Sequence, residues 1–275
     1  MENVVVLIVG VGPAGLATAA CLSQFSIPYV IVERESCSAS LWRNRAYDRL
    51  KLHLAKEFCK SYSGMNVLVV GSGNSGMEIA YDLATHGANT SIIIRSPIHI
   101  MTKEIIRLGM TLARRLPLNL VDNLLVMAAN FIFGDLSRYG IRRPKVGPMI
   151  HKSETGRSAV IDVGTVGLIK KGIIKVHGSI SKSMGDIVEF QCGKKISFDA
   201  IVFATGYKST TNIWLNNGES MLNGNRLPIK EYPNHWKGEN GLYCAGLGRR
   251  GLAGIAADAK NIANDIISVI GAMSG

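Results

Sequence analysis

Two short glycine-rich motifs, 61 positions apart, are the feature that most constrains the fold of this chain: Gly10-Val-Gly-Pro-Ala-Gly15 and Gly71-Ser-Gly-Asn-Ser-Gly76. Each follows an apolar, β-branched run and precedes a stretch with helical periodicity, so each predicts a strand, a tight turn and a helix. In such a unit the first glycine permits the turn, the second lets a pyrophosphate approach the backbone, and the third lets helix and strand pack closely. The sequence therefore predicts an α/β fold with two Rossmann-like dinucleotide-binding domains.

The residue that ends the following strand differs between the two units. It is Glu33 in the first unit, and Arg95 with Ser96 beside it in the second. A carboxylate at this position accepts hydrogen bonds from ribose hydroxyls, so FAD and NAD both fit the first unit. A guanidinium pairs with a 2′-phosphate, which favours NADPH in the second. One site of each kind is typical of a flavoprotein that NADPH reduces.

Apolar runs and turn signals divide the rest of the chain into predicted elements. The predicted strands are Val4–Val9, Tyr29–Val32, Asn66–Val70, Thr90–Ile94, Ile173–Ile180, Ile187–Gln191, Phe198–Ala204 and Leu242–Ala245; the predicted helices are Leu16–Phe25, Met77–His86, most of 103–139 with a break at Pro117, and Ile255–Ile270. The three strands between 173 and 204 are expected to form a β-meander. We predict a discontinuous FAD domain over residues 1–60 and 196–275, with the NADPH domain over 61–195 inserted in it.

Charge and cysteine content exclude several other functions. The net charge is +11, but the basic residues are scattered without a run of five or six, so nucleic acid is not an expected partner; anionic cofactors account for part of the positive charge. None of the five cysteines forms a Cys-x-x-Cys pair or a zinc spacing. This pattern indicates buried thiols in a reducing compartment and argues against a disulfide reductase and against a metal site.

The chain shows no targeting or membrane-spanning pattern. Glu2 precedes the apolar run Val4–Val9, which reads as a strand and not as a signal peptide. The apolar stretch Leu124–Phe133 is far shorter than the roughly 20 residues of a membrane span. It is interpreted as a buried or peripheral helix, and contact with a membrane surface is the alternative. The expected location is the cytoplasm, with the surface of the endoplasmic reticulum as the alternative.

Several further segments carry a family resemblance. They are Leu41–Cys59, Gly71–Glu78, Gly147-Pro148 with Val160–Gly164, Ala204–Tyr207, and Gly241–Gly246 with Arg249–Gly254. Together with the glycine motifs, they resemble the plant flavin-containing monooxygenases of the YUCCA type over nearly the whole chain. The resemblance implies that NADPH reduces FAD, that O2 is captured on the reduced flavin, and that indole-3-pyruvate is converted to indole-3-acetic acid in auxin biosynthesis.

The site residues follow from the motifs and the resemblance together. FAD is expected at Gly10, Gly12, Pro13, Ala14, Gly15, Glu33, Trp42 and Arg43; NADPH is expected at Gly71, Gly73, Asn74, Ser75, Gly76, Arg95 and Ser96. Trp42 and Arg43 are carried over from the family alone. Asn74 and Ser75 are also expected to cap the helix that they begin. No catalytic side chain is expected, since the flavin supplies the reactive group.

One more segment near the C-terminus has two interpretations. The turn Arg249-Arg-Gly251 precedes the last predicted helix. Amides at the start of that helix can stabilise negative charge on a flavin. The alternative is a basic surface loop.

The chain departs from the family pattern after Cys59. Residues 60–64 lead directly into the strand of the second glycine motif, where the family has a long segment that includes a Phe-x-Gly-x-x-x-His motif. This motif occurs nowhere in the chain. We therefore expect exposed strand edges and apolar faces, with the first unit packing on 242–270 instead. Weakened FAD binding follows, and an NADPH-binding remnant or interaction protein is the alternative function.

Overall fold

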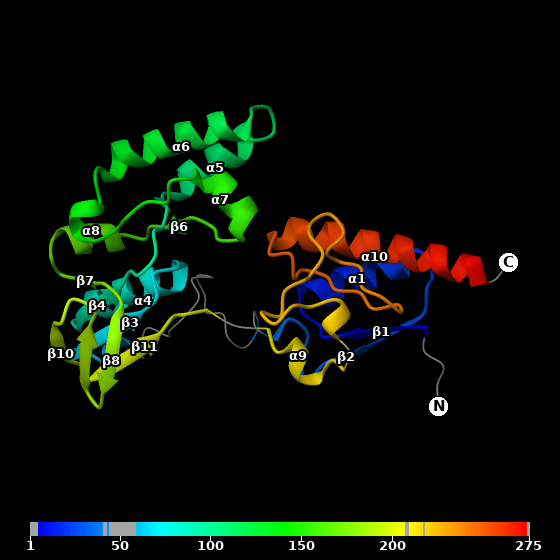
Figure 1. Cartoon of the computed structure of the whole chain (residues 1–275), viewed down its shortest axis with the longest axis horizontal. Helices are drawn as coiled ribbons and strands as arrows, with labels where there is room; N and C mark the ends of the chain where they lie inside the picture. The colour runs from blue at the N-terminus through cyan, green and yellow to red at the C-terminus, as the bar shows by residue number, and fades with distance from the viewer. Residues whose placement is uncertain (1–4, 41–42, 44–58, 207–208, 217, 274–275) are drawn as a thin grey trace. The chain divides into compact units, whose positions relative to one another are not determined.

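The computed structural model describes residues 5–40, 43, 59–206, 209–216 and 218–273 (Figure 1). The chain divides into two compact units. The first comprises residues 1–45 and 207–275, and the second comprises residues 46–206. The assignment of FAD and NADPH to separate domains stays a prediction, and each unit is described by itself below.

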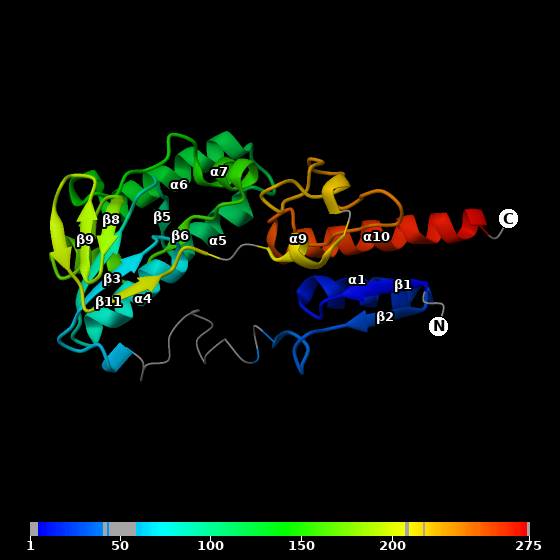
Figure 2. The same cartoon turned by 60° about the horizontal axis from the view of Figure 1, so that its bottom comes forward.

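The first unit packs two helices on a small parallel sheet. Its elements are β1 (Val6–Val9), α1 (Pro13–Gln24), β2 (Tyr29–Val32), α9 (Thr211–Trp214), η2 (Gly218–Ser220) and α10 (Gly251–Met273). Strand β1 pairs in parallel with β2, with Val6 opposite Tyr29. Helices α1 and α10 lie side by side in Figures 1 and 2 and share a core of Ile8, Leu22 and Ile262. The predicted packing of the first unit on the C-terminal helix is therefore confirmed.

The predicted strand Leu242–Ala245 is wrong. Tyr243 forms only an isolated bridge with Lys237, and no described strand lies beside these residues. Gly241 and Gly246 bracket the segment with φ angles of +74° and +84°, so the chain turns at both ends. An apolar run this short, without a neighbouring strand to pair with, remains a loop.

The second unit is built on a four-stranded parallel sheet in the order β11-β3-β4-β7. Its elements are β3 (Asn66–Val70), α4 (Asn74–Thr85), β4 (Asn89–Ile93), β5 (Ile100–Met101), α5 (Lys103–Leu112), α6 (Leu118–Phe133), η1 (Ser137–Tyr139), α7 (Pro148–Thr155), β6 (Val160–Ile161), α8 (Thr165–Lys170), β7 (Lys175–His177), β8 (Ile180–Met184), β9 (Ile187–Phe190), β10 (Lys195–Ser197) and β11 (Ala200–Phe203). Figure 1 shows α5, α6 and α7 gathered in one layer of this unit.

Successive side chains of β3 point to opposite faces of the sheet, and both faces are buried. Val67 and Val69 belong to a core shared with α4 and the helical layer. Leu68 points to the other face, where it packs with Val188 and Phe190 of the small antiparallel sheet β8-β9-β10. A parallel sheet covered on both sides requires such continuously apolar strands.

The meander forms, but with different strands from those predicted. The predicted strand Ile173–Ile180 is two strands: β7 joins the parallel sheet, and β8 begins the meander. The predicted strand Phe198–Ala204 is β11, which pairs with β3 in the parallel sheet. Strand propensity alone does not reveal which sheet a strand joins, because that depends on pairing partners distant in sequence.

Helix α6 contains the apolar stretch predicted to be buried or peripheral, and it is both. Val121, Leu125, Ala129 and Phe133 lie on its buried face. Leu124, Met127 and Phe131 lie on its exposed face, with Phe131 92% exposed. Among the described residues, no helix is both long and apolar enough to cross a bilayer.

Candidate cofactor-binding sites

The first glycine loop lies between β1 and α1 and has the geometry that a pyrophosphate needs. Gly10 has φ of +99°, and a Cβ on Gly15 would stand 2.0 Å from the carbonyl oxygen of Gly10. The loop and the helix therefore pack too closely for a side chain at Gly15. A Cβ on Gly12 would meet nothing within 4 Å, so the space in front of the loop is open. Gly12 caps α1, and Pro13 and Ala14 begin the helix.

Glu33 lies directly beside this loop. Its carboxylate accepts hydrogen bonds from the backbone N–H groups of Val11 at 2.6 Å and Glu35 at 3.0 Å. These bonds, with that from Val11 the strongest, lower the pKa of Glu33 and keep it ionised. The side chain is exposed, so an anionic acceptor for ribose hydroxyls stands at the edge of the loop.

The segment after β2 is described only in part. Trp42 lies outside the described residues, as does most of Leu41–Cys59. Arg43 is exposed, and its backbone N–H donates to Ala39. Ala39 in turn donates to the carbonyl of Val11 at 2.8 Å, which ties this segment to the glycine loop. Their contact with FAD stays a prediction.

The turn before α10 reaches the same loop from the other end of the chain. A Cβ on Gly246 would stand 3.6 Å from the Cβ of Ala14, so the turn lies against the first turn of α1. The N–H of Gly246 donates to Asp258 of α10 at 2.9 Å. Segments near both termini therefore form one surface around the first glycine loop.

The second glycine loop repeats the geometry of the first. A Cβ on Gly76 would stand 1.9 Å from the carbonyl oxygen of Gly71. Gly71 has φ of +120°, and a Cβ there would stand 2.3 Å from the carbonyl oxygen of Ala204. The close approach to Ala204 gives the Ala204-Thr-Gly segment a packing role at this loop. Gly73 faces open space, as Gly12 does.

Asn74 and Ser75 occupy the first turn of α4, but the predicted cap by Asn74 is wrong. Gly73 is the capping residue of this helix and has no side chain. The side-chain oxygen of Asn74 instead accepts a hydrogen bond from the N–H of Ile161 at 2.8 Å. Asn74 therefore anchors β6 to the glycine loop, and Ser75 follows it in the helix.

Arg95 and Ser96 follow β4, as the strand pattern predicts. Arg95 is exposed and Ser96 is half-buried. Arg95 forms none of the ion pairs found in the described part of the chain. A solvated guanidinium without a carboxylate partner is available to an incoming phosphate.

Two other segments that carry the resemblance, Gly147-Pro148 and Val160–Gly164, make hydrogen bonds within the second unit. Asp122, although buried, accepts hydrogen bonds from Met149 and Ile150 at the start of α7. A Cβ on Gly147 would stand 2.3 Å from Asp122, which explains the glycine in Gly147-Pro148. In the motif Val160–Gly164, Asp162 accepts from Val166 at the start of α8.

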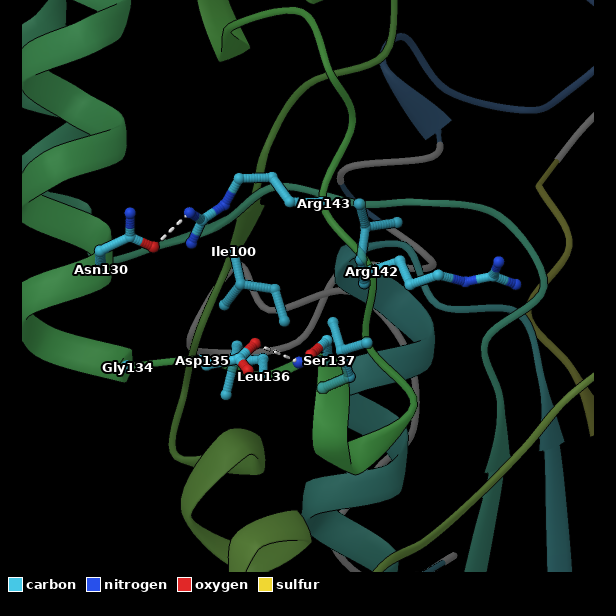
Figure 3. A pocket seen from close by; sticks show the side chains of 10 residues that line it. Ile100, Asn130, Gly134, Asp135, Leu136, Ser137, Arg142 and Arg143 are labelled. Atoms are coloured by element: carbon cyan, nitrogen blue, oxygen red, sulfur yellow. Dashed lines mark hydrogen bonds between the residues drawn. The ribbon is translucent and has the colours of Figure 1, made fainter.

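A cavity of about 610 Å³ lies in the second unit (Figure 3). It is lined by Ile98, Ile100, Asn130, residues 134–137, and residues 141–143. Arg143 donates to Asn130, and Ser137 donates to Asp135 at 2.9 Å. No residue of either glycine motif lines it, so it is distinct from the predicted cofactor sites.

The prediction of buried thiols is confirmed only for Cys59, since Cys21, Cys37 and Cys244 are partly buried and Cys192 is exposed. All five cysteines are free. Burial raises the pKa of Cys59 to about 11 and that of Cys244 to about 12, so neither is a thiolate at neutral pH. The described residues also contain no cluster that could hold a metal ion.

One buried polar pair beside the first loop has no counterpart among the residues predicted from the sequence. His235 and Asp258 are 5% and 3% exposed, and their side chains lie 3.1 Å apart. A lone histidine carries no pattern that marks it in sequence. Asp258 does carry a signal, because it interrupts the apolar face of α10, but that signal does not name a partner.

Comparison with known proteins gives consistent matches. The family model for flavin-binding monooxygenase-like proteins matches residues 51–227. The probable indole-3-pyruvate monooxygenase YUCCA10 of Arabidopsis thaliana is 40% identical, with 98% of each chain covered. YUCCA9 of the same plant is 34% identical, with 96% of this chain and 89% of the relative covered. A flavin monooxygenase mutant from Stenotrophomonas maltophilia has the same fold, with a TM-score of 0.65, 13% identity and coverage of 98% and 100%.

The alignment with YUCCA10 also shows a difference in length. It extends over 378 positions, whereas this chain has 275 residues. Both chains are covered almost to their ends, so the relative carries long internal segments without a counterpart here.

Proposed function

The chain belongs to the flavin-binding monooxygenases of the YUCCA group, and from this membership we propose that it oxidises indole-3-pyruvate to indole-3-acetic acid with NADPH and O2. FAD and NADPH are the cofactors of this monooxygenase. The substrate comes from the names of the relatives, which are indole-3-pyruvate monooxygenases.

One observation carries the assignment of the two cofactors to the two loops. Both loops leave open space in front of their second glycine, at Gly12 and Gly73, but the charged residue beside each loop has the opposite sign. Glu33 is held ionised at the first loop, where it would repel a 2′-phosphate and accept from ribose hydroxyls. Arg95, which follows β4, takes part in no ion pair among the described residues and would attract that phosphate.

In this proposal the residues of the chain bind and orient, and FAD supplies the redox and oxygen chemistry when it is bound. The N-terminus of α1 presents amides to the FAD pyrophosphate, and Glu33 holds the adenosine ribose. The N-terminus of α4 does the same for NADPH, with Arg95 at its 2′-phosphate. Asn74 fixes the second loop through Ile161.

The test is the visible spectrum of the purified protein, taken before and after anaerobic addition of NADPH. Flavin bands that bleach with NADPH, followed by product formation from indole-3-pyruvate in air, would support the proposal. A protein that takes up no flavin even from added FAD would overturn it.

A second function is favoured by a specific observation, namely the open face of the β1–β2 sheet. Leu7 and Val9 of β1 are 58% and 51% exposed, and Val30 and Val32 of β2 are 41% and 43% exposed. The internal segments present only in the relatives would account for such an uncovered face. The second candidate is therefore an NADPH-binding remnant. Calorimetry that detects NADPH binding without FAD binding would favour it.

A further inference from the structure

His235 and Asp258 form a buried pair in the first unit, between the loop before α10 and the helix itself. Nε2 of His235 lies 3.1 Å from Oδ1 of Asp258. Nδ1 of His235 is also buried and has no hydrogen-bond partner in the described part of the chain. A buried polar atom without a partner destabilises a fold. Burial of the unpaired Nδ1 lowers the stability of the fold, so packing alone does not explain the pair.

The second oxygen of Asp258 connects the pair to the glycine turn. Oδ2 accepts a hydrogen bond from the N–H of Gly246 at 2.9 Å. Gly246 in turn lies against Ala14, in the first turn of α1. A chain of contacts thus runs from His235 through Asp258 and Gly246 to the first glycine loop.

The ring of His235 also fills the space beside Gly248. A Cβ on Gly248 would stand 2.6 Å from Nε2 and 2.7 Å from Cδ2 of His235. Gly248 is not among the glycines with positive φ, so its backbone would accept a side chain. The three atoms nearest to that Cβ position all belong to the ring of His235. His235 and Gly248 are therefore complementary in shape.

We propose that His235 and Asp258 are positioning residues for FAD: the contact with Gly248 and the bond to Gly246 fix the turn 246–251 against the first glycine loop. The start of α10 is thereby held where its amides and Arg249 can face the flavin. This inference rests on the proposed function, because it takes the first loop as the FAD site.

The same helix supplies a matched control. Asp265, two turns after Asp258, accepts from Lys237 and from the hydroxyl of Tyr243 at 2.7 Å. It therefore ties the same loop to α10, and neither of these two hydrogen bonds involves the turn 246–251. Replacing Asp265 removes hydrogen bonds between the same loop and α10, but it leaves the contacts of His235 and Asp258 with the turn 246–251 unchanged.

The experiment compares the wild type with His235→Gly, Gly248→Thr, the double variant and Asp265→Asn. The dissociation constant of FAD and the resolution of its visible bands report on the flavin. Hydrogen exchange of the Gly246 amide in the FAD-free protein reports on the turn alone, and Tm reports on overall stability. We expect each single change at 235 or 248 to weaken FAD binding roughly tenfold or more, since positioning contacts of this kind contribute more than about 1.4 kcal/mol.

The double variant should recover much of the affinity, because threonine refills the space and its hydroxyl can donate to Asp258. Asp265→Asn should lower Tm and leave FAD affinity unchanged. The inference is overturned if His235→Gly keeps wild-type FAD affinity and Gly246 protection, or if Asp265→Asn weakens FAD as much. If the wild type takes up no FAD, the proposed function fails and the flavin role of this pair fails with it, while Gly246 exchange still shows whether His235 fixes the turn.

Discussion

The carboxylate of Glu33 accepts a hydrogen bond from the backbone N–H of Val11 at 2.6 Å. This bond joins the end of β2 to the middle of the glycine loop, 22 residues earlier in the chain. It sets the distance between the two groups that the proposed FAD site needs, a pyrophosphate cradle and a ribose acceptor. The carboxylate has further acceptor capacity, and the residue is exposed, so it can also bind a ligand.

We predict that Glu33→Ala weakens FAD binding roughly tenfold or more, because hydrogen bonds to a charged group contribute about 1.5–3 kcal/mol. Glu35→Gln is the matched control, since the Glu35 carboxylate pairs with Arg34. Fluorescence titration with FAD measures both. Equal weakening by the two substitutions would refute a specific role for Glu33.

The pH dependence of this contact follows from the pKa of Glu33, which the bond from Val11 lowers. The contribution of a carboxylate with a lowered pKa is present above its unfolded-state pKa and is lost as pH falls through the folded-state pKa. FAD affinity of the wild type should therefore be insensitive to this group at any pH above about 5. A loss of affinity between pH 7 and 6 that Glu33→Gln abolishes would contradict this assignment.

We predict that Arg95→Ala reduces the preference for NADPH over NADH. Arg95 is exposed beyond β4 and has no carboxylate partner among the described ion pairs, so its removal should leave folding intact. Binding of NADPH should weaken by roughly tenfold or more, while binding of NADH stays nearly unchanged. Titration of both nucleotides measures the ratio. An unchanged ratio would remove Arg95 from the 2′-phosphate site.

The strands next to the glycine motifs were the most predictable part of the fold. Tyr29–Val32 and Asn66–Val70 were predicted with their observed bounds, since each is a largely apolar run rich in β-branched residues that ends at a turn. Leu242–Ala245 is also a short apolar run, but Tyr243 makes only an isolated bridge with Lys237, and the segment forms no strand. Local sequence shows that a run can be a strand, and tertiary pairing decides whether it becomes one.

In the candidate sites, too, features set by local sequence were predictable, and features set by tertiary contacts were not. The glycines and Glu33 could be assigned because their roles depend on spacing along one short unit. The tie between Asn74 and Ile161 could not be predicted, since the two residues are 87 positions apart. The pair of His235 and Asp258 likewise depends on how the loop folds back on α10.

Two phenylalanines on opposite faces of α6 test which face of this helix is buried. Phe133 is 6% exposed and Phe131 is 92% exposed. Phe133→Ala should lower the free energy of unfolding by about 3 kcal/mol or more, because it leaves a cavity in the core. Phe131→Ala should change it by less than about 0.5 kcal/mol. Denaturant titration measures both, and comparable losses would show that Phe131 is buried in solution.

The open face of the β1–β2 sheet gives the last prediction. Leu7 and Val9 are about half exposed, whereas Ile8 between them is 8% exposed and packs on α1 and α10. Exposed apolar surface on a sheet promotes association between molecules. We expect Leu7→Thr with Val9→Thr to reduce self-association without lowering Tm, since threonine keeps the strand propensity. Ile8→Thr, the matched change on the buried face, should lower Tm instead. Sedimentation velocity and thermal denaturation measure these effects. If the double variant were as destabilised as Ile8→Thr, that face would be covered within the folded chain, and the uncovered surface that favours the remnant function would not exist.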